Sequence, residues 1–244
     1  MRAWAGRSRQ SRALMIAVLM LSLDVCNGVT FAGPFEDGYA AYDRGDYSTA
    51  LRAWRPLAEG GNASAQFCLG LMYGNATGVD QDFREALRWY RLAAVQGNAS
   101  AQVNLGLMYA RGDGVDQDSP QAVHWFQLAA AQGYVNGQFN LGVMYAKGDG
   151  VPQDFKESMK WFRLAAVQGD TLAQFRLGLM YQRAEGVPQD LVRGHMWFKI
   201  AAAQGYVPAG KNRDDLSKLM TEEQIAQAEA IARKCEESRY KQCD

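Results

Sequence analysis

The sequence predicts an all-α protein, a right-handed α-solenoid of stacked helical hairpins with capping helices at its ends. Two observations lead to this fold class: a self-similarity with a period of 36 residues, and an apolar pattern at helical spacing within each copy. One hairpin cannot bury its apolar stripe alone, so several must stack into a continuous core. The copies align without a gap, as two sets of residues spaced by 36 show: Trp89, Trp125, Trp161 and Trp197, and Gly70, Gly106, Gly142 and Gly178.

The first 32 residues are typical of a secretory signal peptide. Met1 to Arg12 carries four arginines, and the apolar run from Ala13 to Leu23 is shorter than the roughly 20 residues of a membrane-spanning helix. Cleavage is expected after Ala32, so that residues 1–32 are removed and the mature protein is periplasmic or secreted, with no stable membrane span. A lipid anchor at Cys26 is the alternative.

The charge balance argues against a nucleic acid partner. The chain has 26 Lys and Arg against 26 Asp and Glu, and removal of residues 1–32 leaves 22 against 25. Binding to a phosphate backbone requires clustered cations, and the sequence after the signal offers no such cluster.

After the signal, residues 33–64 are expected to form a shortened, tetratricopeptide-like capping repeat, because aromatic residues such as Tyr39 and Trp54 echo the pattern around a shorter loop. Four full repeats then follow, over residues 65–100, 101–136, 137–172 and 173–208. Residues 209–244 are expected to form C-terminal capping helices and a tail, with a capping box at Thr221 and Gln224 opening the last helix.

Each full repeat reads as two helices joined by a glycine-containing loop. In the first helix, Gly70 and its equivalents indicate close approach of a neighbouring helix. Four aspartates are expected to cap the second helices, and Glu85 and Glu157 are expected to complete capping boxes with two of them. The four caps are Asp82, Asp118, Asp154 and Asp190. A calcium site at Asp113, Asp116 and Asp118 is the alternative, although its spacing lacks the distal Glu of an EF-hand loop.

Three cysteines follow the signal, and Cys235 and Cys243 are the candidate disulfide pair. In a continuous helix they would lie about 12 Å apart, beyond the roughly 7 Å that a disulfide spans between Cα atoms. A disulfide therefore requires the last helix to end between them. Cys68 is expected to stay unpaired, since its equivalents in the other repeats are not cysteines.

The repeat resembles the Sel1-like repeat, a relative of the tetratricopeptide repeat with a longer loop between its helices. The match is Ala-x3-Leu-Gly-x2-Tyr, then Gly-Val-x2-Asp, then Ala-x2-Trp and a terminal Gln-Gly, with departures at Ser158, Ala184 and Gly194. The resemblance implies an adaptor that scaffolds protein complexes, as family members do in protein quality control, exopolysaccharide export and contact between bacteria and host cells. It names no partner.

The sequence offers no catalytic residue, metal site or cofactor motif. Its two histidines, His124 and His195, occupy different positions in their repeats. Some secreted, cysteine-rich relatives bind or slowly hydrolyse penicillins, so a penicillin-binding or β-lactamase-like hydrolase is the alternative to a scaffold. Only Ser238 and Lys241 fit a motif of such enzymes, and they lie in the terminal tail.

In tetratricopeptide-like solenoids the first helices line the concave face, which predicts a groove for a protein or an extended peptide. Its asparagines could hydrogen-bond a peptide backbone through both amide and carbonyl, and Arg176 could take a carboxylate. The aromatic residues of the set could instead pack between hairpins, and the binding site could instead lie in the loops that begin at Arg111 and Lys147. The predicted groove residues are Phe67, Asn104, Leu107, Phe139, Asn140, Val143, Phe175, Arg176 and Leu179.

Overall fold

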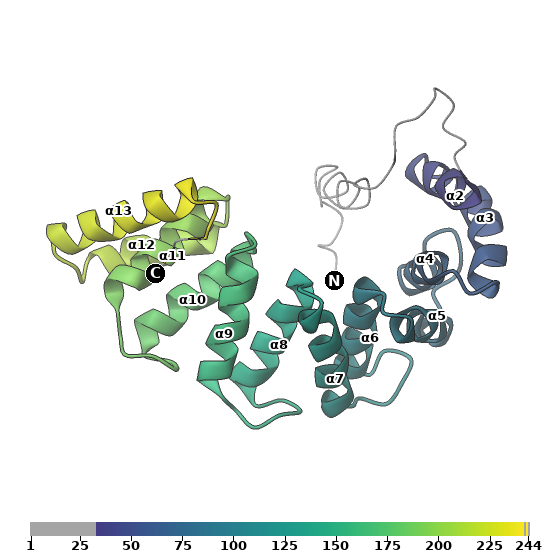
Figure 1. The fold of residues 1–244 in the computed structure, drawn as a ribbon, viewed down its shortest axis with the longest axis horizontal. Coiled ribbons are helices and arrows are strands. Elements are labelled where there is room, and N and C mark those ends of the chain that lie inside the picture. The colour runs from purple at the N-terminus through teal and green to yellow at the C-terminus, as the bar shows by residue number, and fades with distance from the viewer. Residues whose placement is uncertain (1–32, 242, 244) are drawn as a thin grey trace. The chain divides into compact units, whose positions relative to one another are not determined.

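The computed structural model describes residues 33–241 and 243, and Pro34–Asp244 form one compact unit. The predicted all-α solenoid is confirmed, because every regular element in this part of the chain is an α-helix. The predicted signal peptide lies outside the described residues. In chain order (Figure 1) the helices are α2 (Pro34–Asp43), α3 (Tyr47–Glu59), α4 (Ala63–Gly74), α5 (Phe83–Val95), α6 (Ala99–Arg111), α7 (Ser119–Ala131), α8 (Val135–Lys147), α9 (Phe155–Ala166), α10 (Thr171–Arg183), α11 (Leu191–Ala203), α12 (Val207–Ser217) and α13 (Glu222–Glu237).

The helices pair as hairpins, and each hairpin packs on the next one along the chain. In the full repeats the pairs are α4 with α5, α6 with α7, α8 with α9, and α10 with α11. Each second helix also packs on the first helix of the following pair. First helices of consecutive repeats touch as well, α4 with α6 and α6 with α8, so they lie next to one another along one side of the array.

The interior glycine of each first helix receives an aromatic ring from the second helix of the same repeat. A Cβ atom on Gly178 would lie 2.5 Å from the ring of Phe198, which is fully buried and has no room to move. The same contact recurs in the other three repeats, at Gly70 with Tyr90, Gly106 with Phe126, and Gly142 with Phe162. The predicted packing role of these glycines is therefore confirmed.

The predicted caps are confirmed, but two of the predicted capping boxes are wrong. The side chains of Asp82, Asp118, Asp154 and Asp190 accept hydrogen bonds from the backbone at the start of each second helix. The carboxylates of Glu85 and Glu157 turn away from the cap and pair with cations one turn later, Arg88 at 3.3 Å and Lys160 at 3.2 Å. The capping box of Thr221 and Gln224 is present and opens α13.

Buried glutamines, which no motif singled out, tie the helix ends together at each joint. Gln66 donates from Nε2 to the carbonyl of Ala58 at 3.0 Å, and its Oε1 accepts from Nε2 of Gln96 at 2.7 Å. One pair thus joins the end of α3, the start of α4 and the end of α5. The bond between side chains recurs at 2.7–2.8 Å in the other repeats, from Gln132 to Gln102, from Gln168 to Gln138 and from Gln204 to Gln174.

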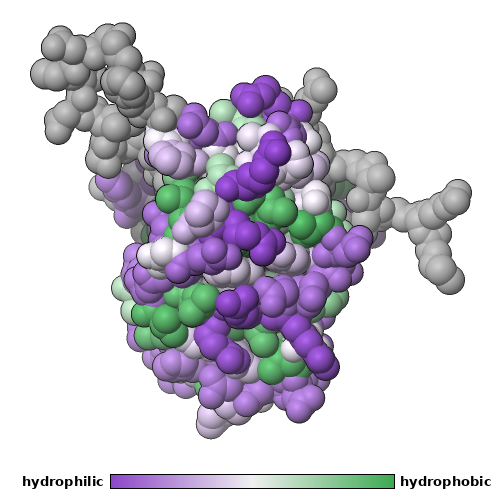
Figure 2. Space-filling view, turned by 90° about the vertical axis from the view of Figure 1, so that its right-hand side faces the viewer, coloured by the Kyte–Doolittle hydropathy of each residue, from purple (hydrophilic) through white to green (hydrophobic). Residues whose placement is uncertain are grey.

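At the N-terminal end, α2 and α3 form the shortened hairpin that the sequence predicts. Trp54 lies against Gly38, and its indole N–H donates to the carbonyl of Phe35 at 3.0 Å. Figure 2 shows this end of the array, where hydrophobic areas are small and separated by hydrophilic residues. Within the described residues no further hairpin covers this end, and a polar surface suits the end of such an array.

At the C-terminal end, α12 continues the period but lacks the residues that accept a second helix. Counting 36 residues on from Leu177 and Gly178 leads to Arg213 and Asp214, so charged side chains stand where an aromatic ring would pack. The next helix, α13, packs on α11 instead. There Ile200 is fully buried, whereas Leu164, its counterpart one repeat earlier, is 40% exposed.

Candidate functional site: the face of the first helices

The aromatic residues of the predicted groove contribute to packing as well as to the surface. Phe67, Phe139 and Phe175 are half-buried. Their ring centroids lie 6.0, 5.6 and 5.6 Å from Tyr90, Phe162 and Phe198, the same rings that fill the glycine positions. These phenylalanines therefore leave only part of each ring accessible to a ligand.

The two asparagines of the predicted groove are half-buried, and each has one amide N–H already engaged. Nδ2 of Asn104 donates to the carbonyl of Ser100 at 2.9 Å, and Nδ2 of Asn140 donates to the carbonyl of Asn136 at 2.7 Å. An asparagine amide has two N–H donors and a carbonyl acceptor, so each side chain keeps one donor and Oδ1 for a ligand.

The apolar members of the groove form a row at one position of consecutive first helices. Leu107 and Val143 are half-buried, and Leu179 is 8% exposed. Arg176, one turn before Leu179 on α10, is exposed. On each of these helices a shallow apolar contact surface therefore lies one turn from a polar side chain.

A hollow of about 70 Å³ lies on this face between α8 and α10, and it brings together three of the predicted residues, Val143, Arg176 and Leu179. Phe162 and Met180 complete its apolar floor. Lys147 and Arg183 stand at its edge, and Glu185 follows in the loop. Arg183 is a cation of this hollow that the sequence analysis did not name. The 36-residue spacing gives the signal, since Arg111, Lys147 and Arg183 hold the same position in three repeats.

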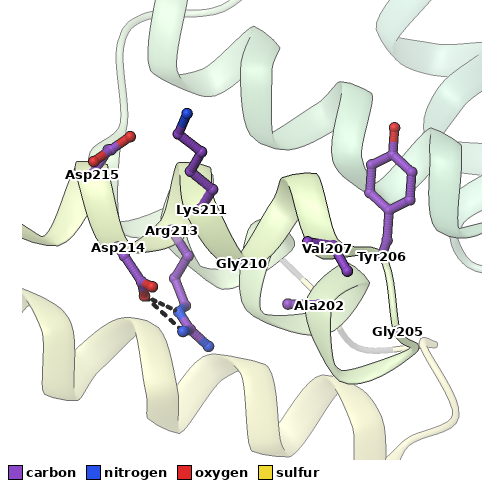
Figure 3. Close-up of a pocket in the computed structure, with 9 residues that line it drawn as sticks. All are labelled: Ala202, Gly205, Tyr206, Val207, Gly210, Lys211, Arg213, Asp214 and Asp215. Atoms are coloured by element: carbon purple, nitrogen blue, oxygen red, sulfur yellow. Dashed lines mark hydrogen bonds and ion pairs between the residues drawn. The ribbon is translucent and has the colours of Figure 1, made fainter.

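A second, more open hollow of about 680 Å³ lies on α12, beyond the last full repeat (Figure 3). Three of its four charged side chains, Arg213, Asp214 and Asp215, already have partners. Arg213 donates to Oδ1 of Asp214 from Nε and from an Nη atom at 2.9 and 2.6 Å, and Asp215 accepts from Lys218 at 2.6 Å. Because three of these four charges are already paired, the face of the first helices is the stronger candidate.

Both histidines belong to second helices, His124 to α7 and His195 to α11. His195 is 2% exposed, with Nε2 at 3.0 Å from Oγ of Ser217, so a substrate has no access to it. Burial, and then the nearby charge of Arg213, lower the pKa of His195. His124 lies on the surface with its ring centroid 5.3 Å from that of Trp125.

Ser238, which belongs to the tail motif that suggested a hydrolase, donates its hydroxyl proton to the carbonyl of Cys235 at 2.7 Å. It therefore closes the end of α13 in this structure. Asp118, one of the three aspartates of the calcium alternative, accepts from the backbone N–H of Gln121 at 2.9 Å as a helix cap. Across residues 33–241 and 243, no three His, Cys, Asp or Glu side chains are grouped to hold a metal ion.

The structure joins Cys235 and Cys243 in a disulfide, with their Cα atoms 4.5 Å apart. The geometry becomes possible because α13 ends at Glu237, and because Arg239 and Tyr240 turn the chain with positive φ angles of 53° and 65°. Cys68 is a buried free thiol, and burial raises its pKa to about 12.

The repeats match a known protein family. The sequence profile of the Sel1 repeat matches residues 63–98, 99–134, 135–170 and 171–206, which is more than half of the chain. The period is the predicted one, and each copy is counted from two residues earlier. Among proteins with curated functions, none matches this chain.

The solved structures that resemble the chain include two with more than 30% identity. A protective antigen present in uropathogenic Escherichia coli strains, described as displaying an SLR fold, is 34% identical over 85% of this chain with a TM-score of 0.78. The chain spans only 46% of the length of that antigen. A Sel1 repeat protein from Oxalobacter formigenes is 32% identical, covers 73% of each chain and has a TM-score of 0.68.

Proposed function

Because the chain belongs to the Sel1 repeat family, we propose that it is an exported, non-catalytic adaptor that holds a protein or an extended peptide along its first helices. Sel1 repeats generally mediate interactions between proteins. The finer parts of the proposal, which are the export, the groove and the peptide-like ligand, rest on residues of this chain.

One observation supports the proposed groove above all others: side chains of the same kind recur at the same position of consecutive first helices. Leu107, Val143 and Leu179 form the apolar row, and Asn104 and Asn140 flank it with free hydrogen-bonding groups. A surface that repeats regularly matches a ligand that also repeats, such as the backbone of an extended peptide. Hydrogen bonds to that backbone would give affinity with little dependence on its side chains.

The scaffold beneath the groove is well suited to binding without rearrangement. The ring of Phe126 fills the space above Gly106, and Gln102 fixes the helix ends at the joint. Rigid presentation of a surface lowers the entropy lost on binding, because fewer side chains become ordered only in the complex.

Two observations support a scaffold over a hydrolase. His195 is buried against Ser217, and Ser238 is hydrogen-bonded at the end of α13. If the pure protein turned over a chromogenic β-lactam, and if Ser238→Ala abolished that turnover, the hydrolase would replace the scaffold.

The proposal of export rests on the arginines and the apolar run within residues 1–32. Among the described helices, none is long and apolar enough to cross a membrane. N-terminal sequencing of protein recovered from the periplasm or the medium should begin near Gly33. A protein that keeps Met1 and stays in the cytoplasm would contradict export.

Photo-cross-linking in the native cell tests the groove directly. A photoreactive amino acid at position Leu107 on α6 should capture a partner protein. The matched control is Leu128 on α7, which is 38% exposed and belongs to the same repeat but to its second helix. Adducts formed from Leu128 and not from Leu107 would move the binding surface to the second helices.

A further inference from the structure

Positive charge along the groove rises toward the joint between the third and fourth repeats. Two residues after the end of its first helix, each of the last three full repeats carries a carboxylate, at Asp113, Asp149 and Glu185, but the number of cations at matching positions of each joint differs. The first joint has Arg111, the second Arg111 and Lys147, and the third Lys147, Arg176 and Arg183.

The cations of the third joint are available to a ligand. Arg183 lies 3.8 Å from Glu185, a long contact between side chains that are 59% and 32% exposed. Lys147 and Arg176 are exposed, and neither forms a hydrogen bond or ion pair with another described residue. This joint therefore holds two unpaired cations at the edge of the hollow.

The floor of the same hollow is apolar. Val143 of α8, Phe162 of α9, and Leu179 and Met180 of α10 line it, and the cations stand around them. Such a site combines a place for an aliphatic side chain with donors for a carboxylate beside it. Arginine binds a carboxylate through two parallel N–H bonds, which fixes orientation as well as supplying charge.

We propose that this joint anchors the bound partner by taking an acidic side chain together with an apolar side chain two residues away, on the same face of an extended segment. The inference rests on the proposed function, because it names the chemistry of the partner at that same groove. A peptide carboxylate fits this site better than a nucleic acid phosphate backbone. The apolar floor offers a phosphate no favourable contact, and Glu185 repels a second negative charge on the ligand. The mature chain is also acidic as a whole, with 22 cations against 25 anions after residue 32.

The test uses a displayed library of random dodecapeptides selected on the purified full chain. The selected peptides should be enriched in Asp or Glu two residues away from an aliphatic residue, and their binding should weaken as salt is raised. The triple variant Lys147→Asn, Arg176→Asn and Arg183→Asn should bind them about tenfold or more weakly, since it removes charge-assisted hydrogen bonds. Its fold should survive, because Asn75, Asn104 and Asn140 occupy the equivalent positions in other repeats.

A matched control removes cations from the second helices, through Arg88→Ala with Lys160→Ala, and should leave binding unchanged. Selected peptides that are neutral or basic, yet lose affinity when Leu107 is changed to Asp, would overturn the acidic anchor and leave the groove in place. Acidic peptides that bind the triple variant as well as the parent chain would also overturn the anchor. If no selected peptide responds to any change in the groove, both the anchor and the proposed function fail.

Discussion

The helices α10 and α12 hold the same place in the period, yet one starts a hairpin and the other ends the array. In α10, Leu177 and Gly178 accept the second helix α11, and the ring of Phe198 lies against the glycine. In α12 the same positions are Arg213 and Asp214, and α13 packs elsewhere. The difference shows that a first helix can form without the Leu-Gly pair, whereas a second helix packs on it only where that pair is present.

The largest effect is expected from removing the segment that covers α11. Deletion of Thr221–Asp244 should expose Met196 and Ile200, which are both fully buried, and should lower the free energy of unfolding by at least about 3 kcal/mol. Urea denaturation and size-exclusion chromatography would measure this loss and any aggregation. A truncated protein that unfolds at the same urea concentration and stays monomeric would show that the array needs no such cover.

A smaller loss of stability is expected from removing the disulfide at the end of α13, the helix that covers α11. By the loop-entropy estimate, the bond between Cys235 and Cys243 stabilises the folded tail by roughly 2 to 3 kcal/mol. The variant Cys235→Ser with Cys243→Ser should therefore unfold earlier, whereas Cys68→Ser leaves the tail intact. Two reactive thiols at these positions in protein from an oxidising compartment would rule out the bond.

The comparison of Gly178 with Asp214 is tested by placing alanine at both. Gly178→Ala should force the methyl group against Phe198, at a cost of about 1 to 3 kcal/mol that exceeds the roughly 1 kcal/mol gained in helix propensity. Asp214→Ala at the same place in the period should change the free energy of unfolding little, because no second helix packs there. Equal effects of the two substitutions would mean that the glycine is not what permits the hairpin.

The smallest effect concerns pH at the junction of α11 and α12. Burial of His195 lowers its pKa in the folded state below the ordinary 6.5, with a smaller contribution from Arg213, while Glu229 acts in the opposite direction. The unfolded chain therefore takes up the proton first as the pH falls. Stability from the neutral imidazole is complete above pH 6.5 and is lost as the pH falls through the folded-state pKa. His195→Gln should flatten this dependence in urea titrations, and an unchanged slope would contradict it.

The structure of the repeat could be predicted from the sequence because its four copies align with one another without gaps. Gly178 and Asp190, for example, have counterparts in every full repeat, so helix positions, caps and packing contacts follow from alignment within the chain. The predicted capping boxes are wrong where a nearby cation competes with the helix cap for the glutamate side chain. Glu85 does not complete a capping box, because Arg88 one turn later offers it a cation.

Other features depend on neighbours that are distant in sequence. Gln66 and Gln96 are 30 residues apart, and only the folded joint shows that they meet. Likewise, helical spacing gives the groove residues of each first helix, but the packing of consecutive helices decides which of them share a hollow. Arg183 therefore joins Arg176 and Val143 only in the structure.

The most direct test of the groove compares asparagines inside and beyond the full repeats. Asn104, Asn140 and Asn212 hold the same position and make the same bond to the carbonyl four residues earlier, at 2.9, 2.7 and 2.9 Å. The measurement is the affinity for a fragment of the partner captured by cross-linking, made by titration calorimetry on variants that remain folded. We predict that Asn104→Ala with Asn140→Ala weakens binding by about 1 to 3 kcal/mol while Asn212→Ala leaves it unchanged. Unchanged affinity in the folded double variant would contradict a binding site on the first helices.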